Sequence, residues 1–191
     1  MDLLNYYLIP TALGISLSAC CGFRVFIPLL VAGLAAKFKY LPLSAGFEWM
    51  SSWPAIICFG VASLAEVVAY YFPVIDNLLD TVTTPSAFIA GTALSASVFT
   101  EFDPMTKWIS AIVAGGGTAG AIQAGTGILR LGSTKLTAGL GNGIIATAEN
   151  ALSIIGSILA LIVPVVIFSM VVVGVVAILY RVFLRKHSTT S

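Results

Sequence analysis

The chain has 191 residues, of which 59% are hydrophobic and only 9% are charged. Soluble domains carry roughly 25% charged residues, so this composition argues against a soluble domain and favours a protein embedded in a bilayer. The net charge of +1 and the lack of a basic cluster with interleaved aromatic residues argue against nucleic acid as a partner.

The first apolar run, residues 3–36, is longer than the roughly 20 residues that one membrane crossing needs. Gly22 and Pro28 interrupt it. We therefore predict three parts, which are a helix up to about residue 19, a break at 20–24 and a short helix at about 27–36. No basic segment precedes this run, so we expect no cleaved signal peptide.

Four further apolar spans follow in the sequence. They are predicted at about residues 53–72, 86–100, 108–128 and 151–180, the last one kinked at Pro164. Polar stretches separate them. A short amphipathic piece is expected at 73–80, ending in a turn at 81–85, and residues 130–142 are polar and rich in glycine.

These elements predict an all-α integral membrane protein with five to six membrane segments, some of them broken or re-entrant. The order of parts after Pro54 resembles that after Ala111, which is a weak sign of an internal repeat. We expect a single polytopic membrane domain over residues 1–191, with a short cytoplasmic tail at 181–191. The basic tail fits the cytoplasmic side, and the expected location is the bacterial inner (plasma) membrane.

Enzyme chemistry has few candidates in this chain. The three cysteines lack the spacing of metal ligands, and the single histidine, His187, is in the C-terminal tail. A Ser/His/Asp set would need a histidine within the apolar segments, and the usual hydrolase and zinc-protease motifs are absent. We expect no enzyme activity, no catalytic residue, no metal site and no cofactor.

Charged residues inside apolar segments are the candidates for a functional site, because a charge at membrane depth is costly. Arg24 has no charged neighbour from residue 3 to residue 36, and a guanidinium beside a helix start could bind phosphate or carboxylate. Arg130 is the second arginine in this group of candidate anion-binding residues. The alternative is an internal ion pair of Arg24 with Glu66, Asp76 or Glu149.

Acidic and amide side chains make a second group. Asp76 and Asp80 are four residues apart, so they share a helix face, with Asn77 between them and Glu66 expected nearby. Two carboxylates on one face could hold a cation or share a proton. The alternative is a solvated helix at the membrane surface.

Hydroxyl and amide side chains in the glycine-rich stretch make a third group. Ser133, Thr134 and Asn142 lie there, and such oxygens together with exposed carbonyls can replace the hydration shell of an ion. The alternative is a loop outside the membrane, where glycine and threonine are common.

Three motifs carry a resemblance over nearly the whole chain. They are Gly22–Leu30 (GFRVFIPLL), Pro73–Asp80 (PVIDNLLD) and Ser133–Asn142 (STKLTAGLGN). Together they resemble a bacterial family of multi-pass proteins known only as a domain of unknown function (DUF 4126). That family also has an acidic residue after the Gly-Asn motif, where this chain has Glu149. The resemblance implies an architecture and a choice of motifs but no activity.

The expected function therefore rests on the properties of charged residues in a membrane. We expect a small transporter or channel for an ion or small anionic solute, with a polar site inside the membrane. One alternative is binding or transport of a lipid through its headgroup phosphate, and another is a non-transporting scaffold or accessory subunit. The expected partners are membrane lipid, an ion, small anion or lipid phosphate, and further copies of the chain, since one copy is small for enclosing a pathway.

Overall fold

The computed structural model describes residues 7–137 and 139–188, and their side chains apart from 73–78, 175, 178, 179 and 181–188. Within that part every regular element is a helix, and loops connect some of the helices. The elements in order are α1 (Ile9–Cys21), α2 (Phe26–Lys37), the short η2 (Glu48–Ser51), α3 (Trp53–Ala69), α4 (Pro73–Val98), α5 (Pro104–Ser110), η3 (Ala111–Gly116), α6 (Gly117–Thr137), α7 (Asn142–Ile162) and α8 (Pro164–Ser188).

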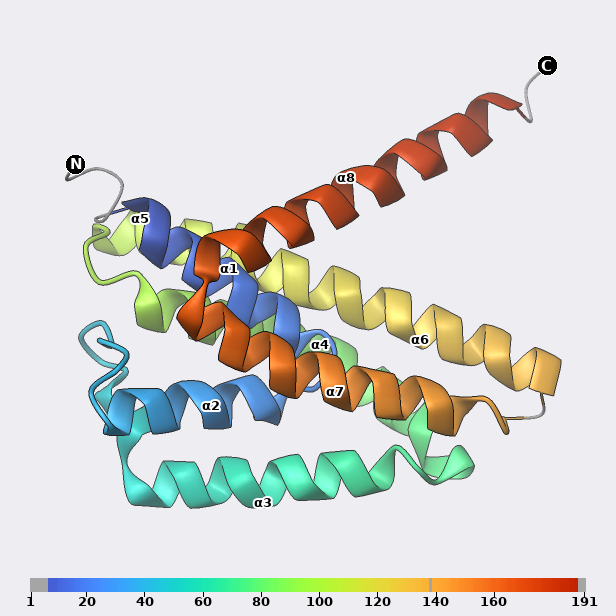
Figure 1. Cartoon of the computed structure of the whole chain (residues 1–191), viewed down its shortest axis with the longest axis horizontal. Coiled ribbons are helices and arrows are strands. Elements are labelled where there is room, and N and C mark those ends of the chain that lie inside the picture. Colours follow the sequence, from blue (N-terminus) through green and yellow to red (C-terminus); the bar gives the residue numbers. More distant parts are fainter. Residues whose placement is uncertain (1–6, 138, 189–191) are drawn as a thin grey trace.

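Helices α1 and α2 form a hairpin that enters and leaves at the same end of the molecule (Figure 1). At 1.5 Å per residue they are only about 20 Å and 18 Å long, so the hairpin turns back partway along the bundle. Gly22 makes the bend possible, because a Cβ there would lie 2.7 Å from the carbonyl oxygen of Ala119 on α6. The sequence predicted this break, and the structure has it at the expected place.

Helix α4 differs from its prediction. The turn expected at 81–85 is absent, and one helix of 26 residues contains both the amphipathic piece and the third span, with Pro85 inside it. Hydroxyls beside the proline donate to carbonyls one turn back, from Thr83 to Leu79 and from Thr84 to Asp80. Pro85 lies on the exposed side of α4, and the helix continues through it although proline has no N–H to donate.

The glycine-rich stretch also differs from its prediction. Residues 130–137 are the last turns of α6 rather than a loop, and α5, the π-helical η3 and α6 follow one another without a break. Glycines allow the continuous helix formed by α5, η3 and α6 to pack tightly on α4. A Cβ on Gly115 would lie 2.7 Å from the carbonyl oxygen of Gly91, so the two backbones touch where they cross.

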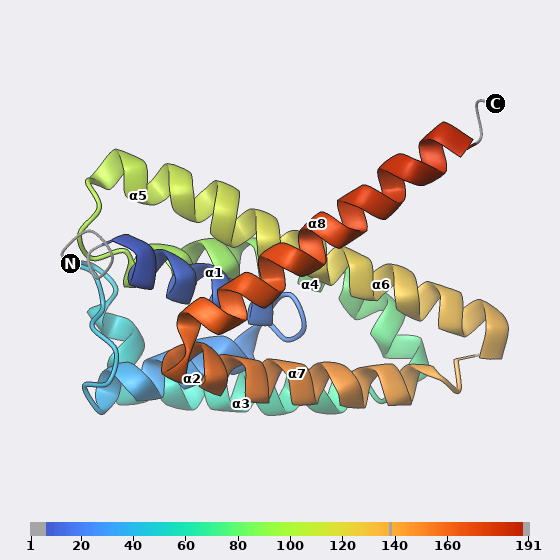
Figure 2. The same cartoon turned by 45° about the horizontal axis from the view of Figure 1, so that its top comes forward.

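The last apolar segment is two helices. Helix α7 ends at Ile162, and α8 begins at Pro164 and runs back at an angle, leaving the rest of the bundle (Figure 2). The prediction of one kinked span at residues 151–180 is therefore wrong. Proline at the first position of α8 starts a new helix, and Val163 before it has the non-helical backbone that a following proline favours.

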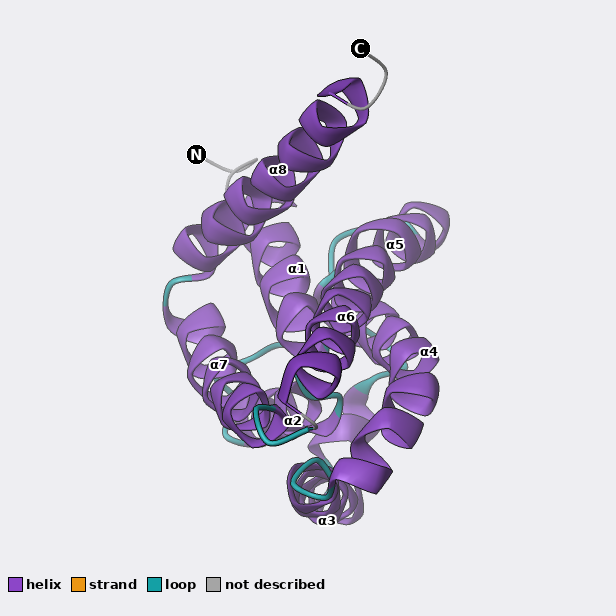
Figure 3. Cartoon of the chain, turned by 90° about the vertical axis from the view of Figure 1, so that its right-hand side faces the viewer, coloured by secondary structure: helices purple, strands orange, loops and turns teal. Residues whose placement is uncertain are grey.

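The helices surround α1, which packs against α4, α6, α7 and α8, while α3 lies on the outer side of α2 (Figure 3). Polar and apolar faces are reversed relative to a soluble bundle. On α7 the buried side includes Glu149, Asn150 and Ser153, whereas isoleucines such as Ile155 and Ile158 are exposed. Helix α7 is the one described helix long and apolar enough to cross a membrane, and α1, α2, α3 and the first part of α8 are shorter apolar helices.

Candidate functional site

Arg24 lies at the tip of the α1–α2 hairpin and is completely buried. Its side chain reaches α7, where Nη1 pairs with Glu149 Oε2 at 2.7 Å and Nε donates to Asn150 Oδ1 at 2.6 Å. The remaining bonds go to carbonyl oxygens, from Nη2 to Ala146 and from Nη1 to Phe23. Every nitrogen of this guanidinium therefore has a protein acceptor, and the arginine fastens the hairpin to α7.

Arg130 lies on α6 and is 1% exposed. Its Nη2 donates to Glu149 Oε2 at 2.5 Å, the oxygen that Arg24 also contacts, and its Nη1 pairs with Asp80 Oδ1 on α4. The sequence Arg24–Glu149–Arg130–Asp80 is thus one chain of ion pairs joining the hairpin, α7, α6 and α4. We call these four residues the ion network. Asp80 is its most accessible member, with 15% of the side chain exposed.

Tyr70, the residue that follows α3, packs against both arginines. The guanidinium carbons of Arg24 and Arg130 lie 4.0 and 4.2 Å from the centre of its ring, close enough for cation–π attraction. Its hydroxyl bonds Thr83 at 2.9 Å and Asp80 at 3.2 Å. Gln123 on α6 donates to Thr83 at 2.8 Å and more weakly to the Asp80 and Tyr70 oxygens. The polar side chains around Asp80 therefore form a second layer of contacts.

Glu66 on α3 binds the start of α2. Its two carboxylate oxygens accept from the backbone N–H groups of Val25 and Phe26, at 2.8 and 3.1 Å. These are the first free N–H groups of α2, where the helix dipole also favours a negative charge. Glu66 is therefore engaged with a helix end, beside the ion network rather than within its ion pairs.

Unsatisfied atoms gather at the Arg130 side of the ion network. Arg130 Nε, Asp80 Oδ2 and Glu149 Oε1 are all buried and make no hydrogen bond in the structure. Buried polar atoms without partners are costly, and each one calls for a reason. Three of them lie on neighbouring members of one network, which makes this side the least satisfied part of the ion network.

The candidates named from the sequence fall into two spatial groups. Arg24, Asp80, Arg130 and Glu149 meet in the ion network, with Glu66 beside it. Ser133, Thr134 and Asn142 lie at the α6–α7 turn, where Asn142 Nδ2 donates to Thr134 at 2.9 Å. Asp76 and Asn77 lie on the first turns of α4, and their side chains are outside the described part of the structure.

The ion pair of Arg24 with Glu149 was one of the alternatives left open by the sequence, and it is present. Sequence reasoning did not find Tyr70, Thr83, Gln123 or Asn150. Gln123 carried a usable signal, since it is a carboxamide inside the apolar span predicted at 108–128. Tyr70 carried none, because an aromatic residue near the end of a span is also typical of the membrane interface.

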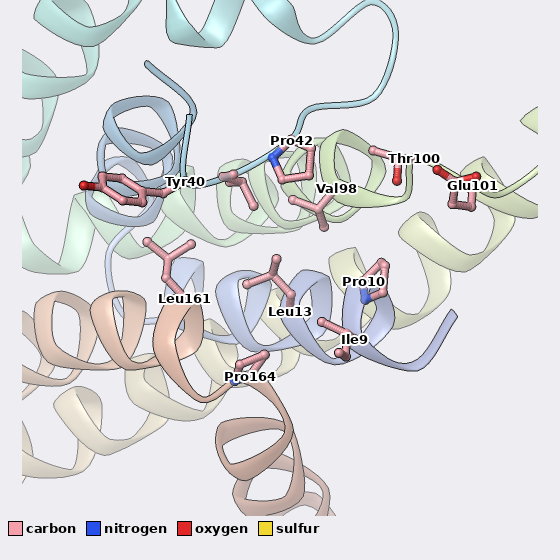
Figure 4. A pocket seen from close by; sticks show the side chains of 11 residues that line it. Ile9, Pro10, Leu13, Tyr40, Pro42, Val98, Thr100, Glu101, Leu161 and Pro164 are labelled. Carbon is pink, nitrogen blue, oxygen red and sulfur yellow. The ribbon is translucent and has the colours of Figure 1, made fainter. Parts of the chain in front are cut away.

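A separate cavity of about 430 Å³ opens at the end of the bundle where the chain begins (Figure 4). Its walls are mostly apolar and come from α1, the segment after α2, the end of α4 and the α7–α8 turn, with Leu13, Pro42, Val98 and Leu161 among them. Glu101 stands at its side. The cavity has none of the ion-network residues in its lining, so the two features are distinct.

One comparison with known proteins gives a match that includes the three sequence motifs. A family model described as "Domain of unknown function (DUF4126)" matches residues 11–185, nearly the whole chain. This is the family that the three sequence motifs resemble, so that resemblance is confirmed. The chain matches no curated protein and no solved structure.

Proposed function

The chain belongs to the DUF4126 family, whose description names no activity, and we propose from its polar interior that it is a small membrane transporter or channel for a small anionic solute. The observation that carries the proposal is the incomplete hydrogen bonding of Arg130. This buried arginine has an unpartnered Nε and pairs with Asp80, the most accessible member of the ion network.

Location in a membrane is part of the proposal. The support is the reversed distribution of side chains, with arginines and carboxylates buried and many large apolar side chains exposed on α3, α6, α7 and α8. In water such a surface would promote aggregation, whereas lipid covers it at no cost. The experiment is extraction of membranes at alkaline pH, in which an integral protein stays in the membrane and a peripheral one is released.

Stability alone gives no reason for the ion network. Taking charges out of water costs several kcal/mol per ion, and well-packed apolar side chains of similar size are often as stable or more so. Ionisable residues at membrane depth therefore point to function by default. Arg24, with every nitrogen bonded to protein, supports the fold, whereas Arg130 retains a free donor for a ligand.

An anion is the ligand that suits Arg130. The Asp80 carboxylate binds the Arg130 guanidinium in the resting protein. A carboxylate or other oxyanion of a solute would bind at the same position and replace it. A lipid phosphate is less suited to the site, because the headgroup would have to reach an arginine that is 1% exposed. We therefore propose a small soluble anion.

Flux into proteoliposomes tests the proposal. Chloride, nitrate, phosphate and lactate are the probes, and potassium with valinomycin sets the membrane potential. We expect at least one anion to enter faster than in empty liposomes and Arg130→Gln to abolish that flux. Lys135→Gln is the matched control, because Lys135 is an exposed cation on the same helix, five residues after Arg130. The proposal is wrong if none of the anions moves, or if Arg130→Gln moves them at the wild-type rate.

A scaffold role is the second candidate, and the saturated bonding of Arg24 favours it. A scaffold would use the ion network only to join α1, α4, α6 and α7. It would then show no flux with any probe, and Arg130→Gln would alter stability or assembly without altering transport.

A further inference from the structure

We propose that the anion crosses together with one proton, which Asp80 takes up on Oδ2 when the anion displaces its carboxylate from Arg130. This inference rests on the proposed function, and it names the coupling ion of the same site.

The two oxygens of Asp80 have different surroundings. Oδ1 accepts from Arg130 Nη1, from the Tyr70 hydroxyl and more weakly from Gln123 Nε2. Oδ2 is buried and makes no hydrogen bond. It faces Gly127 on α6, where an added Cβ would still lie 3.7 Å away. A proton on Oδ2 would therefore break none of the contacts that Asp80 makes.

Charge balance supplies the reason for the proton. In the resting site the Asp80 carboxylate neutralises Arg130. When an anion binds Arg130, the displaced carboxylate would be a second negative charge in a buried place, which is strongly disfavoured. Uptake of one proton gives a neutral carboxylic acid, and the Arg130–anion pair replaces the Arg130–Asp80 pair. On the other side the anion leaves, the proton leaves Oδ2, and the original pair forms again.

Asp80 suits this role better than Glu149 does. Glu149 Oε2 contacts two arginines, so it keeps Arg24 as a partner when Arg130 turns to a ligand. Asp80 has its ion pair with Arg130 alone in the described part of the structure. Its side chain is 15% exposed, compared with 3% for Glu149.

Charged and polar groups from four helices surround Asp80. Arg130 and Gln123 face it from α6, and Tyr70 faces it from the end of α3. Behind them, Glu149 on α7 pairs with Arg130, and Arg24 packs on the same Tyr70 ring. Glu66 acts on both arginines through space. On α4 itself, Thr83 is bonded to Tyr70, and Asp76 is four residues earlier in the helix.

Proton movement can be measured together with anion flux. Proteoliposomes are loaded with a pH-sensitive dye, and an inward gradient of chloride, nitrate or lactate is imposed with the membrane potential clamped. For the wild-type protein we expect internal acidification that matches anion uptake one for one. Because each anion needs one proton, uptake should also fall as the external pH rises.

Asp80→Asn separates coupling from transport, since the amide mimics the protonated acid and leaves Arg130 free for the anion. We expect this variant to move the anion without acidification and with uptake independent of pH. Glu101→Gln removes an exposed acid and should retain one-for-one coupling. Gel filtration and circular dichroism check that both variants fold, and the wild-type stoichiometry tests the proposal without any variant.

The possible results separate the two proposals. Anion flux without protons in the wild-type protein overturns the proton coupling and leaves anion transport standing. Coupled flux that persists in folded Asp80→Asn overturns the assignment to Asp80. Absence of flux with every probe overturns both proposals together.

Discussion

Arg24 and Arg130 are both buried and share one oxygen of Glu149, yet they are bonded differently. Arg24 donates to a carboxylate, an amide oxygen and two backbone carbonyls, so each of its three nitrogens has an acceptor within the protein. Arg130 contacts two carboxylates and keeps Nε without a partner. The comparison teaches that burial of a charge does not by itself mark a binding site. The unsatisfied donors and acceptors beside it are the more specific sign.

Substitution of each arginine in turn is the strongest test of whether the two residues have different roles. Arg24→Gln should lower the free energy of unfolding by about 3–5 kcal/mol, because it leaves Glu149 partly unpaired and frees three further acceptors. Arg130→Gln should abolish anion flux, and it should also lower the free energy of unfolding, because Asp80 loses its ion-pair partner. Denaturant unfolding in detergent, followed by circular dichroism, gives the values. Wild-type stability of Arg24→Gln would contradict the structural role of Arg24.

Two glycines, one beside Arg24 and one beside Asp80, differ in how tightly they are packed. Gly22→Ala places a Cβ 2.6 Å from the Ile122 side chain and 2.7 Å from the Ala119 carbonyl, so the hairpin must shift, with a loss of about 1–3 kcal/mol. Gly127→Ala meets only Asp80, at 3.7 Å, and should change stability by less than about 0.5 kcal/mol. Thermal unfolding midpoints measure both. A neutral Gly22→Ala would contradict the tight packing of the bend.

Tyr70 touches both arginines with its ring, but its hydroxyl bonds only the Asp80 side. Tyr70→Phe should therefore cost about 1 kcal/mol and slow transport, since it removes a donor from Asp80 and leaves the packing of Arg24 intact. Tyr70→Leu, which also removes the cation–π contacts, is the control and should cost more. If Tyr70→Phe and Tyr70→Leu were equally unstable, the ring contacts would contribute nothing.

The smallest expected effect concerns Asp103, the N-cap of α5, which lies far from any ion pair described here. Hydrogen bonds from the side chain and backbone of Thr106 lower the pKa of its carboxyl. This contribution to stability is present above the unfolded-state pKa and is lost as the pH falls through the lower native pKa. Asp103→Asn keeps a cap and removes the titration. We expect its stability to decline less at acidic pH than that of the wild type, with coupling in transport unchanged.

Local sequence signals predicted much of the architecture. Gly22 and Pro28 marked the break between α1 and α2, and the position of a charge beside that break singled out Arg24. The same kind of reasoning failed at Pro85 and at residues 130–137, where both stretches are helical. Proline and glycine end helices that stand alone, but neighbouring helices and nearby hydroxyls can satisfy the backbone and keep such helices intact.

Composition and spacing by themselves determined that this chain is helical, that its charges are few, and which of them are costly to bury. Three sequence motifs carried the resemblance to a family that the match over residues 11–185 confirms. Only the tertiary structure decided which charges meet, since Arg24 and Glu149 are 125 residues apart and Arg130 and Asp80 are 50 apart. It also decided that each nitrogen of Arg24 has an acceptor, whereas Arg130 Nε has none. The physical reason is that the bonding of a guanidinium depends on how many acceptors surround it in space, and packing between distant helices sets that number.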